Sequence, residues 1–110
     1  MKKSEYKEGL DSTFTHNGKI YRVDDLLSAT ENIKSTKMNV GQLDWILEET
    51  EVDPKRVAAA DLSVPIIVVD TKEWGWVVLD GVHRLSLAKY LDNNFIKVKI
   101  IKEKDLPPHI

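Results

Sequence analysis

The chain of 110 residues contains no cysteine. This absence excludes a disulfide framework, a catalytic thiol and a zinc site built on thiolates. The three histidines are scattered and have no metal-ligand spacing, at His16, His83 and His109. No apolar run approaches the ~20 residues that span a bilayer, and residues 1–12 are charged rather than apolar. We therefore expect a cytoplasmic protein that does not contact membranes.

An excess of charge of one sign is also lacking. The sequence has 16 basic and 18 acidic residues, a formal net charge of −2. The whole molecule therefore has no positive field that would favour unspecific binding to DNA. What the chain does have is 42% apolar residues, enough to fill one core in a protein of this length. We expect a flexible segment over residues 1–12 and a single domain over residues 13–110.

The amino-terminal part of this domain predicts a β-hairpin. Asn17-Gly18 lies between two short segments of β-formers over residues 14–23, and this pair supplies the positive φ angles of a two-residue turn. Residues 24–37 have no sustained helical period, so we expect mostly loop there, with at most one helical turn.

Two helices are predicted next. Asn39 and Gln42 have the spacing of a capping box, which predicts a helix over residues 40–49 with one apolar face. Asp53-Pro54 has the pattern of an N-cap followed by a first helical position, which predicts a second helix over residues 54–60.

The carboxyl-terminal half predicts three strands and a helix. Residues 64–69 and 76–79 are continuous apolar runs joined by a short polar link, which favours a central strand and an antiparallel neighbour. From Val82 the apolar spacing becomes helical and stops at residues 92–94. Residues 96–101 then alternate, as in a strand with one buried face. The sequence therefore predicts an α+β domain with a mixed sheet flanked by helices.

The segment Asp80-Gly81-Val82-His83-Arg84 carries the most chemistry, because it crosses the predicted junction of a strand and a helix. The first turn of a helix presents unpaired N–H groups and a partial positive charge, so an anion is favoured there. Arg84 adds a fork of donors that fits a phosphate, and His83 can donate to the same anion or transfer a proton. Asp80 can hold Mg²⁺, orient His83 or accept a proton.

A purely structural interpretation of the same turn is equally consistent with the spacing. Asp80 can serve as the helix N-cap, Gly81 as a turn residue, and Arg84 as a surface partner of Asp80 or Asp92.

The stretch from Val64 to Pro107, with Trp76-Val-Val-Leu-Asp-Gly-Val-His-Arg-Leu-Ser-Leu-Ala88 at its centre, resembles the ParB/sulfiredoxin superfamily. The resemblance is strong over about two fifths of the chain. Upstream, Lys19-Ile-Tyr-Arg-Val-Asp-Asp-Leu-Leu is similar to the opening strand and turn of that fold. The resemblance implies a small ParB/sulfiredoxin-like domain that binds a nucleotide phosphate at Gly81, Val82, His83 and Arg84.

The branches of this superfamily differ at the turn. Sulfiredoxins carry Gly-Gly-Cys-His-Arg, and because Val82 stands at the cysteine position, their reductase chemistry is excluded. ParB partition proteins carry Gly-Glu-Arg-Arg, bind CTP and read DNA with a separate domain, for which this chain has no room. The turn is most similar to the Asp-Gly-His-His-Arg of free-serine kinases. Those enzymes also use a glutamate shortly after the first strand, a place that Glu31 can occupy.

Two classes of function follow. The first is a nucleotide-binding enzyme that transfers phosphoryl groups or hydrolyses phosphate esters, as a nuclease does, with Asp80, His83 and Glu31 as catalytic residues and Asp80 as a Mg²⁺ ligand. The second is a non-catalytic module that senses a nucleotide or binds a protein, including an inhibitor of a nucleic-acid enzyme. As the bound nucleotide we expect ATP, ADP or CTP, with or without Mg²⁺. Nucleic acid and a protein partner stay open as further ligands.

Overall fold

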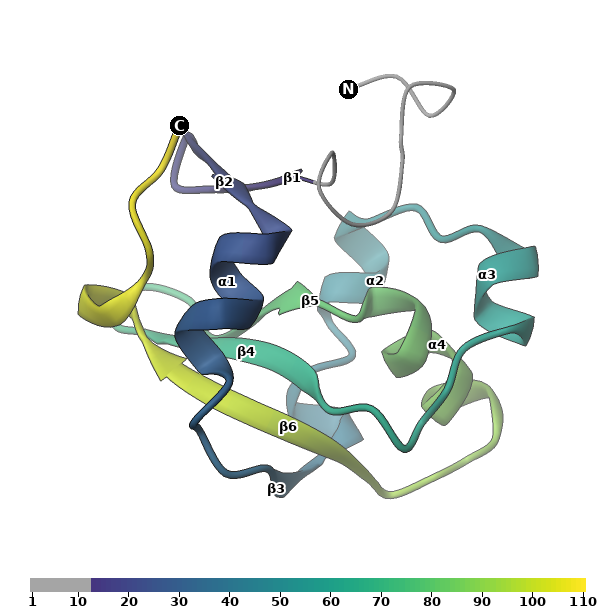
Figure 1. Cartoon of the computed structure of the whole chain (residues 1–110). Helices are drawn as coiled ribbons and strands as arrows, with labels where there is room; N and C mark the ends of the chain where they lie inside the picture. Colours follow the sequence, from purple (N-terminus) through teal and green to yellow (C-terminus); the bar gives the residue numbers. More distant parts are fainter. Residues whose placement is uncertain (1–12) are drawn as a thin grey trace.

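A computed structural model describes residues 13–110 of the chain (Figure 1). The predicted flexible segment over residues 1–12 lies outside the described residues. Among the described residues, no helix is both long enough and apolar enough to cross a membrane.

The predicted amino-terminal hairpin is confirmed. Strands β1 (Thr13–His16) and β2 (Lys19–Arg22) pair antiparallel around Asn17 and Gly18, whose φ angles are 52° and 75°. These positive angles are what a two-residue hairpin turn requires. The rings of Phe14 and Tyr21, opposite each other in the register, stack with centroids 5.2 Å apart.

The prediction of a loop over residues 24–37 is wrong. Helix α1 (Val23–Thr30) follows the hairpin directly and buries Leu26 completely. Its carboxyl end is stabilised from a distant strand, because the Nζ of Lys99 donates to the carbonyl of Thr30 at 3.1 Å. A cation beside the free carbonyls of a helix end is favourable. Lys99 is therefore not the simple solvated side chain that the alternation of the strand suggests.

Strand β3 (Thr36–Asn39) and the helical segment after it also differ from the prediction. Residues 40–49 form a 3₁₀ turn, η2 (Val40–Gln42), and a short helix, α2 (Ile46–Glu49), in place of one continuous helix. Asn39 does cap this segment, but its side chain accepts from the amide of Gly41. Several of the following amides bond to the carbonyl three residues earlier, so the chain winds more tightly than an α-helix.

Helix α3 (Pro54–Ala58) begins as predicted and ends two residues earlier. The Oδ1 of Asp53 accepts from the amide of Lys55 at 3.0 Å, and Pro54 occupies the first turn.

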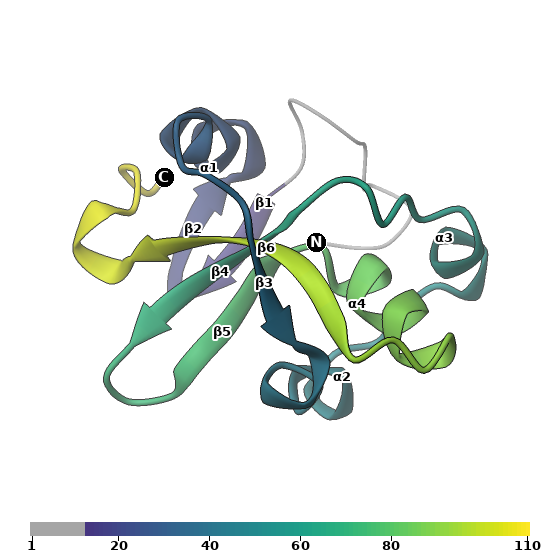
Figure 2. The same cartoon turned by 90° about the horizontal axis from the view of Figure 1, so that it is seen from below.

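The larger sheet has four strands in the order β3-β6-β4-β5 (Figure 2). Strand β4 (Ile66–Thr71) pairs antiparallel with β5 (Gly75–Asp80) and parallel with β6 (Phe95–Lys102). Helix α4 (Val82–Tyr90) connects β5 to β6. The predicted antiparallel pair, the third strand and the mixed sheet are all confirmed. Strand β6 is followed by a 3₁₀ turn, η3 (Glu103–Asp105).

Apolar side chains fill both sides of the sheet. On one face, Ile66, Val68 and Val98 pack with Leu43 and with Leu85 and Ala88 of α4. On the other face, Ile67, Val69 and Ile101 pack with Leu26 of α1. The hairpin and α1 therefore lie on one side of the sheet and α2 and α4 on the other, as Figure 2 shows, and α3 packs against α4. Strand β4 is covered on both faces, which explains the unbroken apolar run over its residues 66–69.

Candidate functional site

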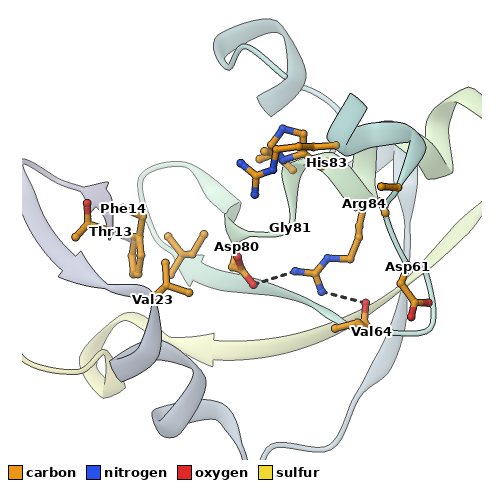
Figure 3. A pocket seen from close by; sticks show the side chains of 14 residues that line it. Thr13, Phe14, Val23, Asp61, Val64, Asp80, Gly81, His83 and Arg84 are labelled. Carbon is orange, nitrogen blue, oxygen red and sulfur yellow. Dashed lines mark hydrogen bonds and ion pairs between the residues drawn. The ribbon is translucent and has the colours of Figure 1, made fainter. Parts of the chain in front are cut away.

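A cleft of about 450 Å³ opens where β5 runs into α4 (Figure 3). Its walls come from segments far apart in the sequence: the hairpin and the start of α1, the end of α3 and the loop after it, and the junction of β5 with α4. The residues that line it are Thr13, Phe14, Val23, Arg56, Ala59, Ala60, Asp61, Val64, Leu79, Asp80, Gly81, Val82, His83 and Arg84. The predicted turn from Asp80 to Arg84 is thus wholly within one cleft.

Gly81 fixes the shape of the turn. Its φ of 108° places it in the left-handed region, where a side chain is strained. A Cβ at this position would lie 2.4 Å from the Cγ2 of Ile66, at the start of β4. Both the backbone angle and the contact therefore require glycine, and they set the point at which α4 leaves the sheet.

A β-bulge at Leu79, two residues before this glycine, changes the direction of the end of β5. Ile67 pairs with Asp80 and Val68 pairs with Val78, so Leu79 is an extra residue without a partner. A bulge bends its strand and re-aims the side chains beside it. Leu79 turns toward the core around Leu26, and Asp80 faces the cleft.

Arg84 is bound on three sides and is largely buried. Its Nη2 donates to the Oδ2 of Asp80 at 3.0 Å, and its Nη1 donates to the carbonyls of Val64 and Pro65 at 3.2 and 2.8 Å. In Figure 3 the guanidinium reaches toward Asp80 from one side, while Phe14 and Val23 lie on the other. These contacts tie α4 to the end of β5 and to the entry of β4.

The contacts of Asp80, Gly81 and Arg84 support one part of the structural interpretation of the turn and contradict another. Arg84 pairs with Asp80, as the structural interpretation expects. The expectation that Asp80 caps α4 is wrong, because Gly81 takes the N-cap position and the Asp80 carboxylate bonds to Arg84 instead. Among the residues described, no side chain caps the amino end of α4.

His83 connects α4 to α3. Its Nε2 lies 3.1 Å from the backbone amide of Asp53, the N-cap residue of α3. An amide can only donate, so Nε2 is the acceptor and the proton of the neutral ring is on Nδ1. The imidazole thus contacts the start of one helix while it lines the cleft from the start of another.

Glu31 is not part of this cleft. It follows the last residue of α1, whereas only Val23, the first residue of that helix, lines the cleft. The structure therefore brings together Asp80, Gly81, Val82, His83 and Arg84 and leaves Glu31 apart from them. Over residues 13–110 there is also no group of three or more histidine, aspartate or glutamate side chains that could hold a metal ion.

Arg56 and Asp61 line the cleft but carry no sequence signal of a site, because their place depends on how the segment after Asp53 folds back on α4. Asp61 accepts from the hydroxyl and the amide of Ser63 at 2.7 and 2.9 Å. These hydrogen bonds, with smaller contributions from the charges of Arg84 and Lys97, hold the pKa of Asp61 below its usual value. Asp61 is therefore a carboxylate at neutral pH.

Comparison with known proteins identifies the fold. No protein-family model and no curated protein matches the sequence. Among solved structures, the chain is similar to sulfiredoxin from Arabidopsis thaliana, with a TM-score of 0.51 and 18% sequence identity over 63% of this chain and 85% of that chain. The protein has a sulfiredoxin-like α+β fold, as the sequence resemblance implies.

Proposed function

We propose that this domain binds the phosphate groups of a nucleotide in the cleft, at the amino end of α4. The observation that carries the proposal is the open end of this nine-residue helix, which faces a cleft and is capped by no side chain of the described residues. The first amides of a helix have no carbonyl partner within the helix, and their dipoles favour an anion.

The composition of the cleft supports a nucleotide rather than a bare phosphate. One part of the lining is apolar and includes Phe14, Val23 and Leu79, and another part carries the guanidinium of Arg56 and the imidazole of His83, with the carboxylates of Asp61 and Asp80 in the same cleft. A volume of about 450 Å³ is within the range of small-molecule sites. The apolar part suits a base or ribose, and the basic part suits the phosphates.

Arg84 supports this site mainly by holding its wall. Its guanidinium already donates to Asp80, Val64 and Pro65. The phosphate contacts proposed here therefore come chiefly from the amides of residues 82–84, and Arg56 adds a positive charge to the wall of the same cleft.

Binding without turnover is the function that this geometry supports best. Of the three catalytic residues expected from the sequence, Asp80 is paired with Arg84, the Nε2 of His83 accepts from Asp53, and Glu31 is elsewhere. We therefore propose the second class of function, a nucleotide-binding module, rather than an enzyme of phosphoryl transfer or phosphate-ester hydrolysis.

Mg²⁺ at Asp80 remains a prediction. A single carboxylate that already pairs with Arg84 does not form a resident Mg²⁺ site, which needs an octahedron of oxygen ligands. If the ion is present, we expect it to arrive with the nucleotide and to be held mainly by phosphate and water oxygens, while Asp80 supplies one carboxylate oxygen.

Thermal unfolding with ATP, ADP, CTP, GTP or inorganic phosphate, each with and without Mg²⁺, tests the proposal. A nucleotide at 100 times its dissociation constant stabilises the folded state by about 2.7 kcal/mol. Arg56→Gln should weaken binding by roughly 10- to 150-fold, the value of a charged hydrogen bond. Lys55→Gln is the matched control, because it removes the same charge from the neighbouring residue, which does not line the cleft.

The same mixtures, analysed by chromatography, separate binding from catalysis. We expect every nucleotide to be recovered intact after long incubation. Product from the native chain that disappears in Asp80→Asn would establish an enzyme. Failure of every nucleotide to stabilise the native chain would contradict the site itself.

A further inference from the structure

A second surface, separate from the cleft, is formed by strands β3 and β6. Together these two strands carry four lysines and no acidic residue, in a protein whose net charge is −2. In Figure 2 they lie at the front, with α1 to one side and α2 and α4 to the other. We call the exposed side chains Lys37, Phe95 and Lys97 on these strands the β3–β6 face.

Two lysines of this face stand directly opposite each other. Lys37 pairs with Lys97 in the antiparallel register, so both side chains project from the same side of the sheet. Like charges in this position repel and reduce stability. Both lysines are exposed, and neither forms an ion pair with any of the residues 13–110.

Asp61 is an acidic side chain that interacts with Lys97 only weakly. Asp61 has its pKa lowered chiefly by the hydrogen bonds from Ser63, and Lys97 contributes least to that effect. The Asp61 carboxylate thus interacts mainly with Ser63 in the same turn rather than with Lys97. Nothing in the fold of the described residues accounts for two unpaired cations side by side.

An exposed aromatic side chain adjoins the two lysines. Phe95 is the first residue of β6, and 57% of it is accessible to solvent. Alternation along the strand puts it on the same side as Lys97, two residues and about 6.6 Å away. A hollow of about 230 Å³ lies beside them, lined by Lys37, Leu62, Ala88, Asn93, Phe95, Ile96 and Lys97. It shares no residue with the cleft.

We propose that the β3–β6 face binds single-stranded nucleic acid, with a base stacked on Phe95 and the backbone phosphates on Lys37 and Lys97. Sites of this kind combine aromatic platforms with a row of basic side chains, and they tolerate many sequences because every base has a flat face. The aromatic ring and the cations follow one another at a spacing on the order of one nucleotide of an extended strand. An acidic peptide would use the lysines alone, and a duplex would keep its bases away from Phe95.

Fluorescence anisotropy with a labelled single strand of about twelve thymidines tests the proposal, in about 50 mM salt and at higher salt. Binding to the native chain should weaken as salt rises. Replacing both Lys37 and Lys97 by Gln should flatten the dependence of log K on log salt by about 1.4, because each lysine contributes about 0.7 on a single strand. Lys72→Gln with Lys104→Gln removes the same charge from exposed positions off the face and should leave the slope unchanged.

The aromatic contact has its own matched pair of variants. Phe95→Ala should weaken binding roughly 5- to 150-fold, the effect of losing one stacked base. Trp74 is similarly exposed, at 60%, but lies in the turn between β4 and β5, and Trp74→Ala should have no effect.

Four results would overturn the proposal. The first is no binding by the native chain in about 50 mM salt, and the second is an equal loss of affinity in the two double-lysine variants. The third is a duplex that binds as tightly as the single strand. The fourth is a poly-glutamate peptide that competes as well as the unlabelled strand, while Phe95→Ala does not change the affinity. The last result would assign the face to an acidic protein partner.

Discussion

The two cationic regions of this domain differ in whether their charges have partners. In the cleft, the guanidinium of Arg84 bonds to Asp80 and to two backbone carbonyls and is mostly buried. On the β3–β6 face, Lys37 and Lys97 lie side by side in solvent without an acidic partner among the described residues. A cation with several protein partners holds a fold together, whereas exposed and repelling cations reduce stability and are available to bind an anion.

We expect Gly81→Ala to have the largest effect on stability, because it disrupts the turn that Arg84 stabilises. It should lower the free energy of unfolding by about 2–5 kcal/mol, because a left-handed backbone angle and a contact with Ile66 both oppose a Cβ. Gly75 has a φ of +70°, but a Cβ there would meet no atom within 4 Å, so Gly75→Ala should cost only about 1–2 kcal/mol. Equal costs in urea unfolding would show that the Ile66 contact is unimportant.

Arg84→Met should have the next largest effect. It keeps the apolar stem but removes the hydrogen bonds to Asp80, Val64 and Pro65, so we expect a loss of about 2–3 kcal/mol in urea unfolding. Lys89→Met serves as the control, because Lys89 is exposed and its pair with the half-buried Asp44 should contribute at most about 1 kcal/mol. A loss no larger than that of the control would mean that Arg84 does not hold the turn.

The lysines of the β3–β6 face should behave in the opposite way. Lys37→Gln combined with Lys97→Gln relieves a cross-strand repulsion and should raise the free energy of unfolding by about 0.2–1 kcal/mol. The variant with Lys72→Gln and Lys104→Gln should be unchanged. A destabilised Lys37/Lys97 variant would remove the contrast between the two regions.

The smallest effect concerns the pH dependence of Asp61. Because its pKa is lowered from the ordinary value of 3.8, its hydrogen bonds to Ser63 stabilise the folded state above that pH, and this contribution is lost as the pH falls through the lower, folded-state pKa. Ser63→Ala should move the midpoint of the Asp61 carboxyl resonance upward in an NMR titration. A midpoint that does not move would assign the shift to the backbone amide of residue 63, which the variant keeps, and to the charges of Arg84 and Lys97.

Much of the fold can be predicted from local sequence. The Asn17-Gly18 turn, the apolar strands β4 and β5 and the start of α4 each depend on neighbours in the chain. Helix α1 is not predicted from local sequence because it buries few apolar side chains. Lys99, which stabilises its carboxyl end, also comes from a strand far along the sequence. Strand β3 is not predicted because only Met38 among its four residues is buried, and its partner is β6.

The site can be predicted only in part for the same reason. Gly81, His83 and Arg84 are close in sequence, so their convergence can be recognised there. The carbonyls of Val64 and Pro65 that bind Arg84, and the amide of Asp53 that contacts His83, come from other segments. Arg56 enters the cleft only because α3 packs against α4.

A backbone amide NMR titration of the native chain with ADP tests the central claim most directly, because it reports on the open end of α4 residue by residue. The account predicts that the amide resonances of Val82, His83 and Arg84 shift together and saturate, at a lower ADP concentration than any shift of Lys37 and Lys97. Saturating shifts on β3 and β6 with none at residues 82–84, or no shifts at all, would contradict it.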